Sequence, residues 1–213
     1  MIRLRDIRFK YNSVYILNGL DLNVTPGDRI GLVGHNGSGK TTLCQIIMGL
    51  LIPESGEVEI FGKVRAGEPD FQEIRGRIGF LFQDADDQLF CPTMLEEVAF
   101  GPLNLGKSPA EAKRIVSKTL DSLSLNGFED RITYQLSGGE KRLVSLATVL
   151  AMEPDILILD EPTGGLDDET IERLVHILNE SNLTFILVSH DREFLERTTN
   201  RILLIKNGII SEA

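Results

Sequence analysis

The stretch that decides the fold of this 213-residue chain is Gly34-His35-Asn36-Gly37-Ser38-Gly39-Lys40-Thr41. It fits the pattern G-x-x-x-x-G-K-[ST], in which glycines let backbone N–H groups turn inward around a phosphate. An apolar run, Arg29–Val33, precedes this loop, and a helical pattern over Thr42–Leu50 follows it. A helix that starts at the loop adds the positive end of its dipole. The stretch therefore predicts an α/β fold with a strand, a phosphate-binding loop and a helix in sequence.

The loop also predicts the roles of individual side chains toward ATP. We expect Lys40 to reach the β- and γ-phosphates and the Thr41 hydroxyl to ligate Mg²⁺. Further ATP contacts are expected from Gly34, Asn36, Gly37, Ser38, Gly39 and Thr42. The alternative is a glycine-rich turn without a ligand, and the flanking strand and helix argue against it.

A second apolar run ends in two carboxylates and predicts the other half of the site. Ile156–Leu159 is followed by Asp160 and Glu161. Asp160, at the strand end, is expected to hold Mg²⁺, usually through water, and Glu161 to take a proton from the attacking water. The alternative is that the two acids only cap the segment before Pro162. ATP and Mg²⁺ are thus the expected cofactors.

Charge and hydropathy exclude several classes of protein. The net charge of −10 disfavours sequence-independent nucleic-acid binding, which depends on Lys and Arg neutralising phosphates, and direct docking on anionic lipid. No run of about 18 apolar residues is present, so direct membrane insertion is not expected. Cys44 and Cys91 lie far apart, and the three histidines show no metal-ligand spacing.

Short apolar runs alternate with helical patterns, which is typical of an α/β domain with a mainly parallel sheet. Parallel-sheet strands are expected at Arg29–Val33, Ile156–Leu159 and Thr184–Val188. Four runs that alternate more are expected to form an antiparallel β layer: Ile2–Phe9, Ile16–Val24, Glu57–Phe61 and Arg77–Phe82. Arg201–Ile205 and Ile209-Ile210 flank Asn207-Gly208, which predicts a hairpin with a type I′ turn.

Capping signals mark the helices. Ser108-Pro109-Ala110-Glu111 and Ser137-Gly138-Gly139-Glu140 are Ser-x-x-Glu boxes, and apolar residues follow each of them at helical spacing. Glu169–Glu180 shows the same spacing. The stretch from about 84 to 136 is more helical than its flanks, so we interpret it as an inserted helical subdomain within a single domain, 1–213.

Leu136-Ser137-Gly138-Gly139-Glu140 resembles the LSGGQ signature of the ABC ATPase family, with Glu in place of Gln. The match covers almost the whole chain. Gln83 resembles the Q-loop residue, Gly164–Asp167 the D-loop, and His190, after a strand, the switch histidine. Tyr11 lies where the family places an aromatic that stacks on adenine. The resemblance implies a P-loop NTPase of ABC type, with a RecA-like core and β layer at 1–83 and 137–213.

In that family two ATPase chains pair head to tail, as a homodimer or a heterodimer. The resemblance implies that Ser137, Gly138, Gly139 and Glu140 contact the ATP of the partner chain, whose P-loop holds it. It further implies that Glu161 is the general base and that His190 and Gln83 sense the γ-phosphate and water. Gln83 would also ligate Mg²⁺, and Asp167 would couple the two sites.

Two segments, Phe82–Phe90 and Val98–Gly106, are most similar to ATPases of energy-coupling factor importers, especially those for cobalt or nickel. The resemblance implies a cytoplasmic subunit held at the inner face of the membrane by an integral membrane partner that docks near 84–106. Vitamins are equally open as substrates. Many ATPases of that group continue past the final hairpin, whereas this sequence ends at Ala213, which suits a shorter variant. Alternatives are an exporter or lipoprotein-release ATPase, and a soluble ATPase of the iron–sulfur assembly type.

Overall fold

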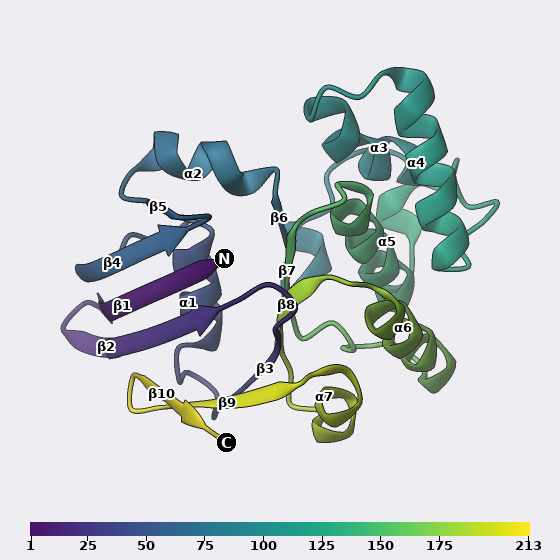
Figure 1. Cartoon of the computed structure of the whole chain (residues 1–213). Coiled ribbons are helices and arrows are strands. Elements are labelled where there is room, and N and C mark those ends of the chain that lie inside the picture. Colours follow the sequence, from purple (N-terminus) through teal and green to yellow (C-terminus); the bar gives the residue numbers. More distant parts are fainter.

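The phosphate loop follows β3 (Arg29–Val33), a central strand of a six-stranded sheet (Figure 1). The computed structural model describes all residues, 1–213. The strand order is β10-β9-β3-β8-β7-β6. The other strands are β6 (Ile78–Leu81), β7 (Ile156–Asp160), β8 (Thr184–Val188), β9 (Arg201–Lys206) and β10 (Ile209–Glu212). All neighbours pair in parallel except β9 and β10, which form the predicted hairpin.

The turn of this hairpin has the backbone that its sequence predicts. Asn207 and Gly208 have φ values of 54° and 78°. Both values are positive, as a type I′ turn requires. The turn therefore confirms the hairpin that was predicted from Asn-Gly.

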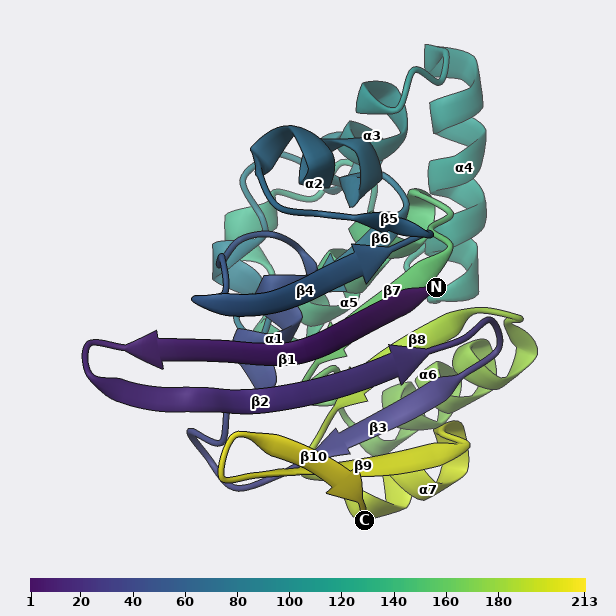
Figure 2. The ribbon, with the colours of Figure 1, turned by 60° about the vertical axis from the view of Figure 1, so that its left-hand side comes forward.

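A second sheet is antiparallel and lies in front of the first when the molecule is turned (Figure 2). Its order is β2-β1-β4-β5. The strands are β1 (Ile2–Tyr11), β2 (Val14–Val24), β4 (Ser55–Ile60) and β5 (Lys63–Val64). Together, the two sheets confirm the predicted fold class, a mainly parallel core with an antiparallel β layer.

One strand was assigned to the wrong layer. Arg77–Phe82 was expected in the antiparallel layer, but β6 pairs in parallel with β7. All four residues of β6 are buried. Gly79 explains the error: a Cβ there would lie 2.3 Å from Val149 of a covering helix, so this position is filled by a neighbour rather than exposed. The alternating pattern in Arg77–Phe82 therefore arose from differences in residue size and not from one face of the strand being exposed to solvent.

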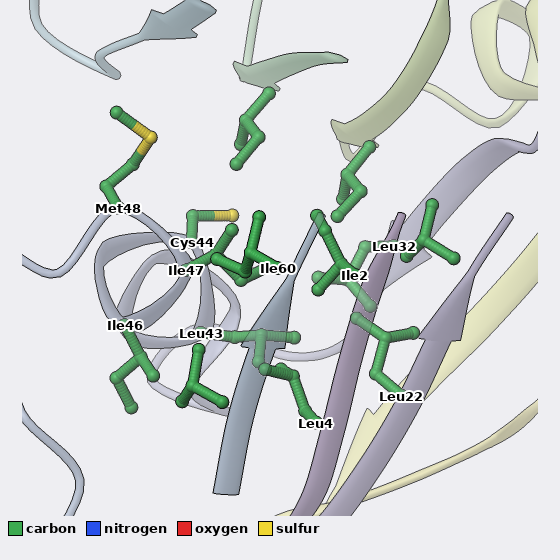
Figure 3. Close-up of a cluster of buried hydrophobic side chains, with 14 of the residues drawn as sticks. Ile2, Leu4, Leu22, Leu32, Leu43, Cys44, Ile46, Ile47, Met48 and Ile60 are labelled. Carbon is green, nitrogen blue, oxygen red and sulfur yellow. The ribbon is translucent and has the colours of Figure 1, made fainter. Parts of the chain in front are cut away.

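The central strands are covered on both faces, so their side chains divide between two hydrophobic clusters with a period of two. Ile156 and Ile158 of β7 belong to the cluster that faces the antiparallel sheet. Leu157 and Leu159 belong to the cluster on the opposite face. Helix α1 (Lys40–Ile47) lies between the two sheets, and Figure 3 shows its apolar side chains gathered with those of the strands.

Six further helices follow α1 along the chain. They are α2 (Glu68–Arg75), α3 (Met94–Asn104), α4 (Pro109–Ser122), α5 (Gly138–Ala151), α6 (Asp168–Glu180) and α7 (Arg192–Thr198), with 3₁₀ turns at Ala85–Asp87 and Thr133–Gln135. Helices α4, α5 and α6 were predicted, whereas α2 and α7 were not. Helices α3 and α4 lie together at one end of the molecule, with α5 beside them (Figure 1). No helix combines the length and the apolar character needed to cross a bilayer.

Helix α4 provides a test of the capping box. The backbone N–H of Ser108 donates to Glu111 Oε2 at 2.9 Å, and the N–H of Glu111 donates to Ser108 Oγ at 3.4 Å. We expect Ser108→Ala to lower the free energy of unfolding by about 1 kcal/mol, because an N–H of the first turn loses its acceptor. Urea unfolding measures this change. Ser117→Ala, at an exposed position inside α4, is the control, and an equal loss in both variants would contradict the capping role.

Candidate functional site

The phosphate loop wraps around the ammonium group of Lys40. Its Nζ donates to the carbonyl oxygens of Gly34 at 2.8 Å and of His35 at 3.2 Å. Lys40 is only 8% exposed, and this burial lowers the pKa of its ammonium group. A buried cation held at the centre of a loop suits the binding of an anion. The loop therefore presents the charge that a triphosphate requires.

Two glycines make this loop possible. A Cβ at Gly34 would lie 2.6 Å from Ser38 Oγ and 2.7 Å from the carbonyl oxygen of Ile205. Gly39 has a φ of 103°, and a Cβ there would lie within 2.9 Å of Leu17 and Ile16. Larger residues at these positions would push the loop away from Ile205 of one neighbouring strand and from Ile16 and Leu17 of another.

Thr41 and Asp160 bring together two oxygen atoms suited to a hard cation. Thr41 Oγ1 donates to Asp160 Oδ2 at 2.8 Å. Asp160 is 1% exposed, and burial raises the pKa of its carboxyl group, while the Thr41 hydrogen bond opposes that shift. Magnesium prefers hydroxyl, carboxylate and water oxygens, so this pair fits the expected ion.

Glu161 has a strained backbone and a free acceptor. Its φ is 49°, a left-handed value that a non-glycine residue rarely adopts. Glu161 Oε1 is buried without a hydrogen-bond partner. His190 Nε2 lies 3.4 Å from that oxygen, and the His190 backbone N–H donates to Oε2 at 3.3 Å. The unpaired oxygen is available to accept a proton.

A cleft of ≈ 370 Å³ unites most of the residues predicted to bind nucleotide. It is lined by Tyr11, Ile16, Asn36, Gly37, Gly39, Lys40, Thr41, Thr42, Gln83, Asp160, Glu161 and His190. Ile16 was not predicted; only its place in the fold, beside the loop, reveals it. Gly34 and Ser38, which were also predicted to contact ATP, do not line the cleft, and Ser38 is buried. Tyr11 is 47% exposed, with its ring edge-on to Phe9, so it is open to a planar ligand.

The signature residues lie outside this cleft. Ser137 is the N-cap of α5, and its Oγ accepts from the Glu140 N–H at 3.3 Å. Gly138 and Gly139 line a larger neighbouring groove of ≈ 800 Å³ that also reaches Thr41 and Gln83. The signature glycines therefore border the groove beside the nucleotide cleft and are absent from the lining of the cleft itself.

Asp167 also lies outside the cleft and has a local role. It is the N-cap of α6, where its Oδ1 accepts from the Thr170 N–H at 2.8 Å. This bond and the Thr170 hydroxyl lower the pKa of the Asp167 carboxyl group. The cap fixes the loop that precedes α6.

Arg142 is a residue that the sequence did not single out. Its side chain is buried, and its guanidinium donates to five backbone carbonyls, those of Phe82, Gln83, Asp160, Glu161 and Pro162. Burial lowers the pKa of Arg142, whereas the carboxylates of Asp160 and Glu161 raise it. One side chain of α5 therefore ties the Gln83 segment to the strand end that carries both acids.

These features define the class of protein. A P-loop lysine, a threonine paired with a strand-end aspartate, and a glutamate with a free oxygen form a site that binds and hydrolyses a nucleoside triphosphate. The signature at the start of α5 distinguishes the cassette type within this class. The chain is an ATPase.

Comparison with known proteins gives the family. The profile of the ABC transporter family matches residues 17–164, and the chain belongs to that family. It is 52% identical to a putative ABC transporter ATP-binding protein of Nitratidesulfovibrio vulgaris, over 99% of this chain and 78% of that protein. It is 41% identical to the energy-coupling factor transporter ATP-binding protein EcfA of Methanothermobacter thermautotrophicus, over 98% of this chain and 68% of that protein.

Solved structures agree with the fold. One is cbiO1 from Clostridium perfringens, part of the ABC transporter complex cbiONQ, with a TM-score of 0.86, 32% identity and coverage of 99% of this chain and 86% of that one. Another is a dimeric ATP-binding cassette bound to ADP and Pi in a post-hydrolysis state, with a TM-score of 0.91 and 29% identity. The match covers 100% of this chain and 98% of that cassette.

Proposed function

We propose that this ABC ATPase energises an energy-coupling factor importer for cobalt or nickel ions or for a vitamin. In this proposal two ATPase chains pair head to tail beneath an integral membrane subunit, which holds them at the inner face of the membrane. The relatives named as energy-coupling factor ATPases support the importer class. The observation that carries the hydrolytic part is the buried, unpaired Oε1 of Glu161 beside Asp160 and His190.

Hydrolysis needs a base for the attacking water. We assign this role to Glu161, whose Oε1 takes one proton as the water oxygen bonds to the γ-phosphorus. The bond between that phosphorus and its bridging oxygen breaks, and the products are ADP and phosphate. His190 approaches the same oxygen and orients Glu161 and the γ-phosphate.

Binding of the substrate rests on the loop. Lys40 exchanges its two carbonyl acceptors for phosphate oxygens, and Asn36, Gly37 and Thr42 line the same cleft. Thr41, Asp160 and Gln83 would hold Mg²⁺, which neutralises charge on the β- and γ-oxygens. Tyr11 is placed to stack on the adenine.

The start of α5 completes the site of the second chain. Ser137, Gly138 and Gly139 offer a hydroxyl and first-turn N–H groups, which suit a phosphate. Asp167 holds the neighbouring loop and couples the two sites. ATP then bridges the two chains, and its hydrolysis removes the bridge.

Segment 84–106 is the proposed docking surface for the membrane subunit, and we propose that it belongs to a helical subdomain, about 84–136. Phe90 and Phe100 are 66% and 46% exposed, with their rings edge to face at 4.8 Å. Asp84, Asp86 and Asp87 line the edge of the groove that also reaches Gly138 and Gly139, and Asp86 pairs there with Lys141 at 2.6 Å. Leu89 of the same segment is half-buried against the core. A segment that carries both carboxylates and exposed aromatic rings suits a basic, amphipathic helix.

Co-purification tests the proposal. We would tag the Glu161→Gln chain, solubilise cells in detergent with MgATP, and identify the bound proteins. We expect a polytopic membrane protein and a small substrate-binding membrane subunit, and the loss of both from an Asp86→Lys, Asp87→Lys variant. Arg192→Glu, on the exposed start of α7, is the charge-reversal control. Recovery of soluble partners alone would overturn the importer assignment.

A further inference from the structure

The signature of this chain carries a negative charge at a place where the family pattern has a neutral residue. Glu140 Oε2 accepts the backbone N–H of Ser137 at 2.8 Å. The Glu140 carboxylate is therefore hydrogen-bonded to Ser137, the residue whose hydroxyl is proposed to contact the γ-phosphate. The Ser137 hydrogen bonds lower the pKa of Glu140, with a smaller contribution from Arg131, so it is ionised at neutral pH.

A carboxylate at this place opposes the function assigned to it. ATP brings several negative charges to the same turn of α5, and like charges at short range repel strongly where water is excluded. The Ser-x-x-Glu box does not itself require a charge, because glutamine makes the same hydrogen bond to the N-cap. Either the site tolerates the repulsion, or another group cancels it.

The positive charge of Arg131 lies beside the negative charge of Glu140. Its Nη1 donates to Glu140 Oε1, the carboxylate oxygen that the cap leaves free. Its guanidinium lies 3.9 Å from the centre of the Phe128 ring, which limits its freedom. The backbone of this segment is also anchored, since Ile132 bridges to Thr93 at the start of α3. Arg131 is therefore held against Glu140 without nucleotide.

We propose that Arg131 is a positioning residue whose positive charge offsets Glu140, so that the start of α5 can receive the γ-phosphate held by the partner chain. This proposal rests on the proposed head-to-tail pairing. It makes the Arg131–Glu140 pair the equivalent, in charge, of the neutral glutamine in the family signature.

Charge alone then orders four proteins. The pair is neutral in the wild type, negative in Arg131→Gln, positive in Glu140→Gln and without charge in the double variant. The ATP-bridged dimer should be tightest in Glu140→Gln, equal in the wild type and the double variant, and weakest in Arg131→Gln. A purely structural role for Arg131 predicts instead that the double variant is as weak as Arg131→Gln. Arg131→Lys keeps the charge and should stay close to the wild type.

The measurement is the ATP concentration that gives half-maximal dimerisation, followed by light scattering in the Glu161→Gln background. We expect Arg131→Gln to raise it about tenfold and Glu140→Gln to lower it. The double variant should return to within about twofold of the parent. At about 1 M salt, where the Debye length is about 3 Å, the differences should shrink.

Arg77→Gln is the matched control, because Arg77 also pairs with an acid, Asp155, and lies 3.8 Å from a ring centre, that of Phe61. It should leave the half-maximal concentration unchanged. If the Glu161→Gln parent does not dimerise with ATP, the head-to-tail pairing is wrong, and this inference fails with it. If the parent dimerises but Arg131→Gln matches it, or the double variant is not restored, only the charge compensation is wrong.

Discussion

Glu161→Gln is expected to lower ATP turnover about 10²- to 10³-fold while ATP binding is retained, because an amide cannot accept the proton of the attacking water. Glutamine has the same shape as glutamate, so the strained backbone at φ 49° and the contact with His190 are kept. Phosphate release under saturating MgATP measures turnover. Nucleotide titration measures binding, and light scattering shows whether the ATP-bound dimer accumulates.

The control for this substitution is Glu180→Gln, an exposed residue at the end of α6 that does not line the cleft. It removes the same charge and should leave turnover unchanged. A Glu161→Gln protein with more than about a tenth of the wild-type turnover would show that another group, or water itself, takes the proton. Loss of ATP binding in that variant would assign Glu161 to binding instead.

The parts of the fold that the sequence predicted are those set by local physics. Gly34 and Gly39 occupy positions where a Cβ would clash. The close packing of the loop therefore requires the same glycines that define its sequence pattern. Thr184–Val188 is a strand buried on both faces, and its continuous apolar run predicts both properties. Ser108 and Ser137 start helices because their side chains accept first-turn N–H groups.

The features that the sequence did not predict depend on which segments meet in three dimensions. Nothing local distinguishes β6 from an antiparallel strand; its partner is β7, far along the chain. Helix α2 was missed because its short, polar sequence places only Phe71 and Ile74 in the core. Arg142 looks like any arginine on a helix until the carbonyls of two distant segments converge on it.

The same limit applies to the signature. The sequence showed that Glu140 departs from LSGGQ, but it did not show which residue offsets the charge of Glu140. Arg131 lies nine positions earlier, too far for a local helix pair, and its contact arises from the fold of the loop before α5. The net charge at the start of α5 therefore depends on a residue that only the folded chain brings beside Glu140.

Arg142→Ala is expected to have the largest effect on stability. It removes the charged donor of five backbone carbonyls in a buried site, which we expect to lower the free energy of unfolding by about 3 kcal/mol. Arg142→Lys keeps a charge but offers one nitrogen to acceptors that lie on two segments, so about half of that loss should remain. Urea unfolding measures the loss of stability in both variants, provided that the dependence of the unfolding free energy on urea concentration is unchanged.

Arg142→Ala is also expected to lower ATP turnover at temperatures where the protein stays folded. Arg142 joins Gln83 to the strand end that carries Asp160 and Glu161, so its loss should displace the base and reduce turnover about 10²-fold. Arg114→Ala, at an exposed position on α4, is the control and should change unfolding by less than about 0.5 kcal/mol. Full turnover in folded Arg142→Ala would mean that the segments hold their positions without it. Arg142 would then stabilise the fold without positioning the base.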